Sequence, residues 1–425
     1  MNPIQFATHS NPLIFFVTYG NGHIGKVAPV VHALRERGVR TRVMALTLGY
    51  RQAQRLGLDP VGYRDYLHLV NQRKATAYGR LLLPTNQHPD VDDEESVAYL
   101  GVNYLEWVQE HGREGARRRY LQGGRRSFMP QKFIGQVIDQ IQPSLIVSTA
   151  SPRSEQAAIE AGVARGIPTL TMMDLFALPH DNFRRNAVFA DRITVLCELA
   201  RDNLIEAGVH SAKISVTGCP AYDKIFDPQM ASIGLDWKRR LGWEGLEVVM
   251  WAGNLEEAAP NVPPEFSGPG LGILVEKRLR DWVAQRRDVA LIVRYHPNQY
   301  HLFPDLGAQE RVYRSNPGQD PLHEQLFACN CIVTQTSTVG FEGALMGKRL
   351  LALSFSPWVI NFDFDYGKLG LGESVPSLET LVPMLEAPMH EPGNRKAFPP
   401  PGPATQRVVD TMLQILTGPT APKGY

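Results

Sequence analysis

Short apolar runs that alternate with helix-like stretches constrain this 425-residue chain more than any other feature of its sequence. In the first half, the runs cover residues 13–19, 39–46, 143–150, 167–173 and 191–196. Such an alternation is typical of βαβ units, in which parallel strands form a sheet and helices cover its faces. The sequence therefore predicts an α/β fold.

The same alternation returns in the second half of the chain. Further runs cover residues 246–253, 289–296, 331–336 and 349–355, with helix candidates near 273–286, 319–328 and 338–346. A length of 425 residues suits two or three domains of roughly 150 residues each. We therefore expect two Rossmann-like domains.

The distribution of proline, glycine and charge suggests where these domains end. The first domain is predicted to cover residues 1–220, with a long polar insertion at 63–130. A Pro/Gly-containing stretch at 221–244 is predicted to be the linker, and 245–400 the second domain. Residues 401–425 contain one amphipathic helix, which we expect to pack back toward the first domain.

Composition excludes several classes of protein. A net charge of +1 argues against a nucleic-acid partner, and four cysteines without a C-x-x-C pair argue against a disulfide scaffold or zinc site. We therefore expect a cytoplasmic protein. The apolar run from Leu13 to Val17 is too short to span a bilayer, so membrane contact would be peripheral, at the inner face.

A glycine-rich turn follows the first strand run. Gly20, Gly22 and Gly25 surround His23 where a helix is expected to begin, and this geometry lets a ligand approach the backbone. The acidic ribose partner of a dinucleotide fingerprint is missing downstream, which disfavours a nicotinamide enzyme. His23 could accept a proton near neutral pH, or it could simply hydrogen-bond the turn.

Three strand runs of the second half end in residues suited to a ligand. The residues in question are Gly253, Asn254, Arg294, His296, Thr336, Ser337 and Thr338. Hydroxyl groups and unpaired N–H groups at a helix start can hold an anion, and Glu342, one turn into that helix, could accept both hydroxyls of a ribose. An ordinary N-cap with a nearby acidic residue is the alternative.

Three segments resemble known motifs. They are TYGNGHIGKVAPVVHALRERG at 18–38, ISVTGCPAYDKI at 214–225 and TSTVGFEGALMGKRLLAL at 336–353. The chain resembles nucleotide-sugar glycosyltransferases of the GT-B fold, together with UDP-N-acetylglucosamine 2-epimerases and CDP-glycerol glycerophosphotransferases. This resemblance implies two Rossmann-like domains that face a cleft.

The resemblance also implies roles for the two domains. The second domain would bind a nucleotide sugar of the UDP, CMP or CDP type, and the first would bind the acceptor. Glu342 would hold the ribose, with Ser337 and Thr338 at the diphosphate. Gly253 and Asn254 would flank that diphosphate. Thr336, Arg294 and Gly22 complete the expected donor set, and His296 with Pro297 resembles a His-Pro motif of enzymes that use CMP- or CDP-linked donors. No metal and no separate cofactor are implied.

The resulting prediction is a glycosyltransferase that moves a sugar to an acceptor hydroxyl on a glycan, a lipid-linked molecule or a small molecule, in polysaccharide or glycoconjugate biosynthesis. Two epimerase motifs, His-Arg-x-Glu-Asn and Asp-Ser-Gly-Gly, are absent. An epimerase-like enzyme is therefore an alternative, as are a CDP-alditol phosphotransferase and a non-catalytic nucleotide-sugar-binding protein.

Candidate residues for the reaction come from several loops. His23 is the first candidate for the base, and Asp174 and Asp181 are its rivals, because their loop leaves a strand of the same sheet. Asp363 and Asp365 could bind sugar hydroxyls. Arg117 and Arg118 of the insertion could meet an anionic acceptor or lipid headgroup, although a solvated helix face would have the same composition.

Overall fold

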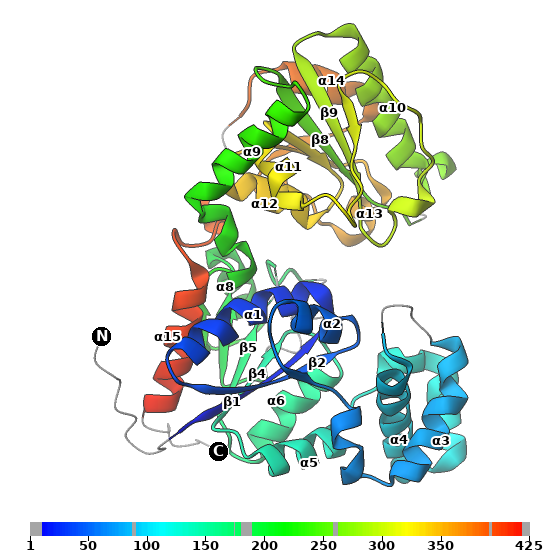
Figure 1. The fold of residues 1–425 in the computed structure, drawn as a ribbon, viewed down its shortest axis with the longest axis vertical. Coiled ribbons are helices and arrows are strands. Elements are labelled where there is room, and N and C mark those ends of the chain that lie inside the picture. Colours follow the sequence, from blue (N-terminus) through cyan, green and yellow to red (C-terminus); the bar gives the residue numbers. More distant parts are fainter. Residues whose placement is uncertain are drawn as a thin grey trace. The chain divides into compact units, whose positions relative to one another are not determined.

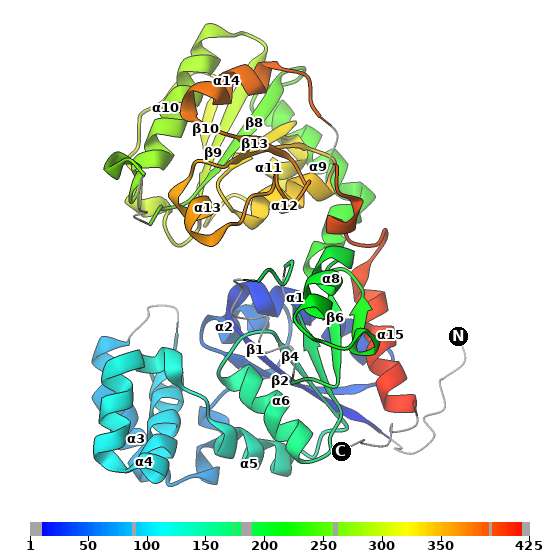
Figure 2. The same ribbon diagram turned by 180° about the vertical axis from the view of Figure 1, so that it is seen from behind.

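The computed structural model describes residues 11–86, 91–173, 175–179, 189–257, 262–390 and 393–418. The chain divides into two compact units (Figures 1 and 2). Unit 1 comprises Met1–Ala221 and Pro399–Tyr425, and unit 2 comprises Tyr222–Phe398. Each unit is built around its own parallel sheet, so the predicted α/β fold with two Rossmann-like domains is confirmed.

Unit 1 contains a seven-stranded sheet in the order β3-β2-β1-β4-β5-β6-β7. Its strands are β1 (Leu13–Tyr19), β2 (Arg40–Leu46), β3 (Pro60–Val61), β4 (Leu145–Thr149), β5 (Thr169–Met172), β6 (Arg192–Val195) and β7 (Ile214–Val216). Strand β1 pairs in parallel with β2 on one side and with β4 on the other. Its five middle residues are buried, because helices cover both faces of the sheet.

The helices of unit 1 follow the strands in alternation. They are α1 (Gly20–Glu36), α2 (Leu48–Arg55), α3 (Gln72–Leu82), α4 (Asp93–Gly123), α5 (Gln131–Ile141), α6 (Ser154–Ala164), α8 (Glu198–Glu206) and α15 (Ala404–Thr417). Short 3₁₀ segments cover Arg64–Leu69, Leu83–Thr85, Gly124–Ser127 and Ser211–Lys213. These helices leave the carboxyl ends of the strands as the edge where loops gather.

The C-terminal helix α15 is part of the core of unit 1. Its residues Val408, Val409 and Met412 are fully buried in one cluster with side chains of α1 and β1. Arg407 strengthens the attachment, since its Nε donates to the carbonyl oxygen of Thr217 at 2.7 Å. A segment far away in the sequence therefore completes the hydrophobic face of α1.

The insertion predicted at 63–130 forms two closely packed helices, α3 and α4. Small residues make the contact possible: a Cβ on Gly79 would lie 2.0 Å from the carbonyl oxygen of Val97, and one on Gly101 would lie 1.9 Å from that of Ala75. The backbones of α3 and α4 can approach this closely only because those Cβ atoms are missing. The polar composition of this segment did not indicate a helical hairpin, because the two helices contact each other at glycine and alanine residues.

Unit 2 contains a six-stranded parallel sheet in the order β10-β9-β8-β11-β12-β13. Its strands are β8 (Glu247–Gly253), β9 (Val289–Tyr295), β10 (Val312–Arg314), β11 (Cys331–Thr334), β12 (Arg349–Leu353) and β13 (Glu373–Val375). Strand β8 is the central strand, paired with β9 and with β11. All seven residues of β9 are buried.

The helices of unit 2 are α9 (Pro228–Arg240), α10 (Gly270–Gln285), α11 (Leu322–Ala328), α12 (Thr338–Leu345), α13 (Pro357–Phe362) and α14 (Leu378–Glu386). Additional 3₁₀ segments cover Pro220–Phe226, Pro264–Phe266, Tyr300–Leu302 and Arg395–Ala397. Helix α10 packs on the sheet through Leu271, Val275 and Leu279, which are fully buried.

The predicted linker at 221–244 is wrong for most of its length. Helix α9 occupies this stretch and packs on α11, where a Cβ on Gly234 would lie 2.5 Å from Cβ of Phe327. Trp237 is 5% exposed and makes an edge-to-face contact with Tyr313. The segment therefore belongs to unit 2, whose first residue is Tyr222, and proline and glycine content alone did not distinguish a helix with an N-terminal proline from a linker.

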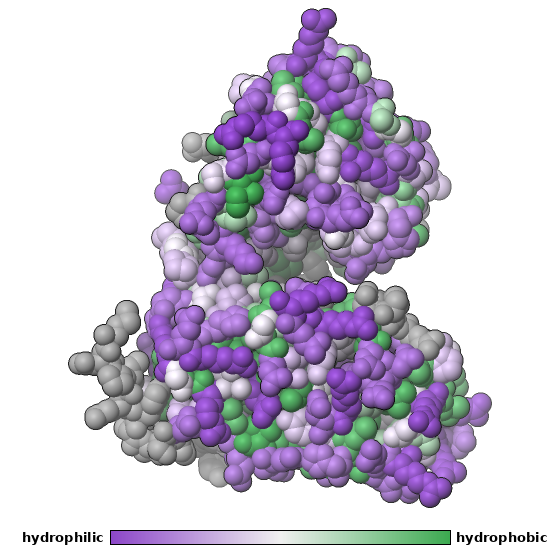
Figure 3. All heavy atoms as spheres, in the orientation of Figure 1, coloured by the Kyte–Doolittle hydropathy of each residue, from purple (hydrophilic) through white to green (hydrophobic). Residues whose placement is uncertain are grey.

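Hydrophilic side chains cover most of the face in Figure 3, and the apolar side chains on it are scattered within each unit. Within the described ranges, no helix is both long and apolar enough to cross a membrane.

Candidate functional site

Each sheet has one position where the strand order reverses. In unit 1 the chain winds outward from β1 in both directions, so the reversal lies between β1 and β4. In unit 2 it lies between β8 and β11. In open parallel sheets, helices leave opposite faces at such a position and a crevice remains beyond the carboxyl ends of the strands. The residues that follow these four strands are therefore candidates for ligand binding.

In unit 1, the turn after β1 depends on two glycines. Gly20 begins α1 with a φ of +69°, a conformation that L side chains rarely adopt. Gly49 of α2 lies directly against it, since a Cβ on Gly49 would be 3.1 Å from the backbone nitrogen of Gly20. Gly22 is exposed, and a Cβ on it would meet no atom within 4 Å. The start of α1 is thus held close to α2 with open space above the turn.

His23 lies in the first turn of α1 and connects the two strands at the reversal. Its Nδ1 lies 2.7 Å from Oγ1 of Thr149, the last residue of β4. The hydroxyl of Thr149 is buried, so this contact fixes the orientation of a partly exposed imidazole. The structure therefore places His23 at the position in the fold where ligands bind.

The loop after β4 carries strain and buried charge. Arg153 has a φ of +77°, and its guanidinium lies over the ring of Tyr19, 4.5 Å from the centroid. Glu155, at the start of α6, is 1% exposed, and its Oε1 has no hydrogen-bond partner in the described part of the chain. Burial raises the pKa of Glu155 to about 8. Strained backbone and perturbed carboxyls concentrate at functional sites.

In unit 2, Gln335 joins the ends of β8 and β11. Its Oε1 accepts from the backbone N–H of Asn254 at 3.1 Å, and its Nε2 donates to the carbonyl oxygen of Asn254 at 2.9 Å. Gly253, just before Asn254, could not carry a side chain, because a Cβ there would lie 2.8 Å from the ring of Trp251. This arrangement fixes the backbone at the reversal point.

The end of β9 lies beside the same edge. The backbone N–H of His296 donates to the carbonyl oxygen of Gly253 at 2.9 Å, which extends the pairing with β8. The ring Nδ1 of His296 accepts from the N–H of Asn298 at 3.3 Å, which favours a neutral ring with its proton on Nε2. Desolvation lowers the pKa of His296 and supports the same protonation state.

The loop between β11 and α12 presents three hydroxyl side chains. Ser337 caps the helix, with its Oγ accepting from the N–H of Val339 at 3.3 Å, while Thr336 is partly exposed and Thr338 is exposed. The hydroxyl of Tyr366 donates to the carbonyl oxygen of Ser337 at 3.0 Å, which holds the backbone of this loop in place. Hydroxyls and the first N–H groups of α12 therefore share one short segment at the reversal point.

Glu342 lies one turn into α12 and is 8% exposed. Its Oε2 is 3.1 Å from Nε2 of His323, a residue of α11 that the sequence analysis did not single out. His323 comes from a separate segment and carries no motif, so only the packing of α11 beside α12 could identify it. The contact holds the carboxylate of Glu342 in place one turn after the start of α12.

Two predicted donor-binding residues have structural partners instead. Asp365 is 1% exposed and accepts from the N–H of Gly367 and the hydroxyl of Ser374, both at 2.8 Å. Arg294 is 7% exposed and uses its Nη1 on Ser315, Asp320 and Gln325. The contact of Asp365 with sugar hydroxyls stays a prediction, since the structure shows its carboxylate bonded within the protein, and Arg294 supports the edge from within.

The remaining predicted residues lie elsewhere. Asp363 is exposed at the end of α13 and pairs with Lys368 at 2.9 Å. Arg117 and Arg118 are exposed on α4, and the pocket beside that helix is lined by Arg125 instead. Asp174 and Asp181 fall outside the described residues.

A buried carboxylate that the predicted site did not include shapes the loop after β8. Glu256 accepts from the hydroxyl of Ser356 at 2.6 Å and from the N–H of Trp358 at 2.8 Å, which ties this loop to the start of α13. Burial raises its pKa. In the ranges covered, no group of three or more His, Cys, Asp or Glu side chains could hold a metal ion, and metal independence stays a prediction.

Comparison with solved structures identifies the fold. No family model and no curated protein matches the chain. The UDP-GlcNAc 2-epimerase from Neisseria meningitidis, bound to UDP-GlcNAc, is 13% identical with a TM-score of 0.59 and covers 95% of this chain and 100% of its own. The enzyme from Methanocaldococcus jannaschii is 14% identical with a TM-score of 0.59 and covers 94% and 99%; that from Rickettsia bellii is 12% identical with a TM-score of 0.53 and covers 96% and 97%.

The fold is of the GT-B type. The predicted structural kinship with UDP-N-acetylglucosamine 2-epimerases is confirmed, because the similarity extends over nearly the full length of both chains.

The buried carboxyl of Glu155 leads to a pH prediction. In the folded protein it stays protonated up to about pH 8, whereas in the unfolded chain it ionises near pH 4.5, so unfolding releases a proton between these values. Raising the pH across this window should therefore destabilise unit 1. In Glu155→Gln, this pH-dependent loss in the free energy of unfolding should be smaller by an amount on the order of a few kcal/mol.

The measurement is urea denaturation at pH 5 and pH 8, followed by hydrogen exchange in peptides from β1 and β4. Glu206→Gln, at an exposed position on α8, is the matched control and should keep the wild-type pH dependence. An identical loss of stability in the wild type and Glu155→Gln would contradict the prediction.

Proposed function

We propose that this protein is an enzyme that binds a nucleotide sugar at the carboxyl edge of the unit 2 sheet and acts on the sugar. The observation that carries this proposal is the convergence at one reversal point of a backbone held by Gln335, the hydroxyl-rich start of α12 and the buried carboxylate of Glu342. Together they offer donors to a diphosphate and an acceptor for ribose hydroxyls.

An epimerase-type reaction is the first candidate for the chemistry. Several solved structures with this fold are UDP-N-acetylglucosamine 2-epimerases, and the similarity covers both domains rather than the nucleotide-binding half alone. These neighbours favour a UDP-linked sugar over the CMP- or CDP-linked donors suggested by His296 and Pro297.

Glycosyl transfer to an acceptor hydroxyl is the second candidate. It is favoured by the residues at the reversal points, because this chain has TQTSTVG and WAGNLEE in place of the Asp-Ser-Gly-Gly and His-Arg-x-Glu-Asn motifs of the epimerases. In both reactions a base is needed, and the ordered imidazole of His23 is the first candidate for it. In transfer, His23 would take the proton of the acceptor hydroxyl as that oxygen bonds to the anomeric carbon, while the bond from this carbon to the diphosphate oxygen breaks and the nucleoside diphosphate leaves.

A product analysis tests the proposal and separates the candidates. Purified protein is incubated with UDP-GlcNAc and with other UDP-, CDP-, CMP-, GDP- and dTDP-sugars, and sugar configuration and free nucleotide are measured by NMR. Inversion at C2 without an acceptor supports epimerisation. Nucleotide release that requires a hydroxyl acceptor supports transfer, and the absence of both changes with every donor contradicts the proposal.

His23→Ala should lower turnover by roughly 10²–10⁴-fold, because a positioned general base contributes about that much. Affinity for UDP, measured by calorimetry, should stay unchanged since His23 belongs to unit 1. His32→Ala is a matched control on the same helix, where Nε2 of an exposed imidazole lies 2.8 Å from the carbonyl oxygen of Leu56. Near-normal turnover of His23→Ala would exclude His23 as the base.

Glu342→Gln should weaken UDP binding about tenfold or more, because an amide oxygen accepts from ribose hydroxyls less strongly than a carboxylate. Glu324→Gln is the control on neighbouring α11, where the carboxylate pairs with Arg240 at 2.8 Å. Equal affinities of Glu342→Gln and the wild type for UDP would place the ribose elsewhere.

A further inference from the structure

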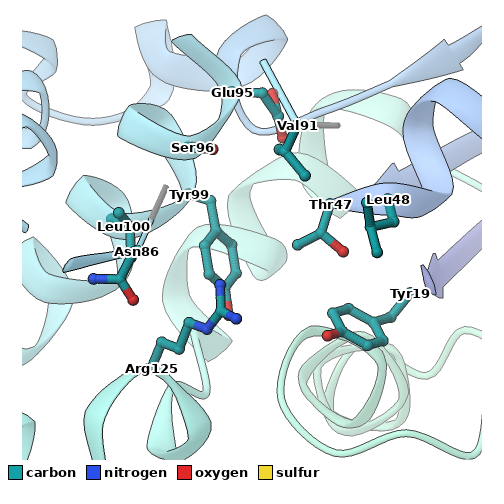
Figure 4. A pocket seen from close by; sticks show the side chains of 10 residues that line it. All are labelled: Tyr19, Thr47, Leu48, Asn86, Val91, Glu95, Ser96, Tyr99, Leu100 and Arg125. Atoms are coloured by element: carbon teal, nitrogen blue, oxygen red, sulfur yellow. The ribbon is translucent and has the colours of Figure 1, made fainter. Parts of the chain in front are cut away.

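A pocket in unit 1 lies between the edge of the sheet and the α3–α4 insertion. It encloses about 60 Å³. Its lining comes from the end of β1 (Tyr19), the β2–α2 junction (Thr47 and Leu48) and the insertion, which supplies Asn86, Val91, Glu95, Ser96, Tyr99, Leu100 and Arg125. Figure 4 shows Tyr19 and Tyr99 on opposite sides of the space, and the side chain of Arg125 extending toward Tyr99.

The wall at the β2–α2 junction is strained and has an unsatisfied hydroxyl. Thr47 has a φ of +53°, which costs free energy for a β-branched residue. Its Oγ1 is buried, and no group in the described ranges bonds to it. Buried hydroxyls normally have a partner in the protein, in water or in a ligand. The strain and this hydroxyl both lie at the wall of the pocket.

The balance of charge around the pocket is positive. Arg125 is exposed and forms no ion pair with the described acidic residues. The guanidinium of Arg153 lies over the ring of Tyr19, which lines the pocket. Two of the carboxyls near the pocket are only partly ionised near neutral pH. Burial raises the pKa of Glu95 to about 7 and that of Glu155 to about 8.

The carboxyl of Glu95 also has a structural task. It accepts from the N–H groups of Tyr63 at 2.7 Å and Arg64 at 3.1 Å, so it anchors the 3₁₀ segment that follows β3. Arg125, by contrast, has no such role among the hydrogen bonds of the described residues. Among the described residues, Arg125 has no acidic partner, whereas the carboxyl of Glu95 is already used by two backbone N–H groups.

We propose that this pocket binds a small sugar-like ligand that carries an anionic group, a carboxylate or a phosphate, and that Arg125 is the residue that recognises that group. A volume of about 60 Å³ exceeds the roughly 10–15 Å³ that one water molecule needs by this measure, and it suits one substituent of a few non-hydrogen atoms. The aromatic rings of Tyr19 and Tyr99 offer apolar surface to the carbon atoms of the same ligand.

This inference rests on the proposed function, because it assigns unit 1 a second ligand beside the nucleotide sugar of unit 2. Arg125 lines the pocket, whereas Arg117 and Arg118 do not, because the 3₁₀ segment Gly124–Ser127 turns the chain at the end of α4. The anionic specificity expected of the insertion is therefore assigned to a different arginine.

The experiment measures binding to the full-length protein by saturation-transfer NMR. The probes are glucose, glucuronate and glucose 6-phosphate, which differ only in the group at C6. The wild type should bind at least one of the two anionic sugars about tenfold more tightly than glucose, because a charge-assisted contact contributes about that factor. Tighter binding of glucuronate than of glucose indicates a carboxylate ligand, and tighter binding of glucose 6-phosphate than of glucose indicates a phosphate ligand.

Arg125→Ala should reduce the affinity for the anionic sugar to that for glucose, and Arg125→Lys should restore part of it. Arg117→Ala, an exposed arginine on the same insertion, should bind like the wild type. UDP binding by all variants should be unchanged, since Arg125 belongs to unit 1. Three outcomes would overturn the inference: equal affinities of the wild type for all three sugars, the absence of binding, or unchanged binding by Arg125→Ala. UDP binding and turnover test the proposed function separately.

Discussion

The parallel pairing of one central strand on both of its sides is the constraint on which the rest of each unit depends. Strand β1 lies between β2 and β4, and β8 lies between β9 and β11. Because all strands run in the same direction, their carboxyl ends meet at one edge, and the reversal of strand order leaves room there. The contact between His23 and Thr149 and the contact between Asn254 and Gln335 both span such a reversal point.

The buried polar groups at the two sheet edges differ in their hydrogen-bond partners. In unit 2, Gln335 and Glu256 have partners in neighbouring loops, and hydrogen bonds of this kind hold the backbone in place before a ligand arrives. In unit 1, Thr47 and Arg153 adopt strained backbone angles, and one oxygen of Glu155 is buried without a partner in the described structure.

The packing of the α3–α4 insertion places side chains at the proposed ligand pocket of unit 1. Gly79 and Gly101 allow the two helices to touch through their backbones, which gives the hairpin a rigid, narrow contact. The insertion places Tyr99 of α4 and Arg125 of the 3₁₀ segment Gly124–Ser127 at the pocket, with Tyr19 of the sheet edge on its other side. Under the proposal above, ligand specificity would change through the insertion without any change in β1 or in the start of α1, where His23 lies.

The sequence alone determined the α/β class, the main strands and the residues that follow them, because hydrophobic periodicity and strand-end glycines are local properties. It located His23, Ser337 and Glu342 at strand ends and helix starts for the same reason. Only the tertiary structure decided that α9 belongs to unit 2, that His323 holds Glu342 and that Asp365 is buried. Those facts depend on contacts between segments far apart in the chain. Likewise, Arg125 rather than Arg117 or Arg118 lines the pocket, because the turn after α4, and not the local charge pattern, aims the side chain.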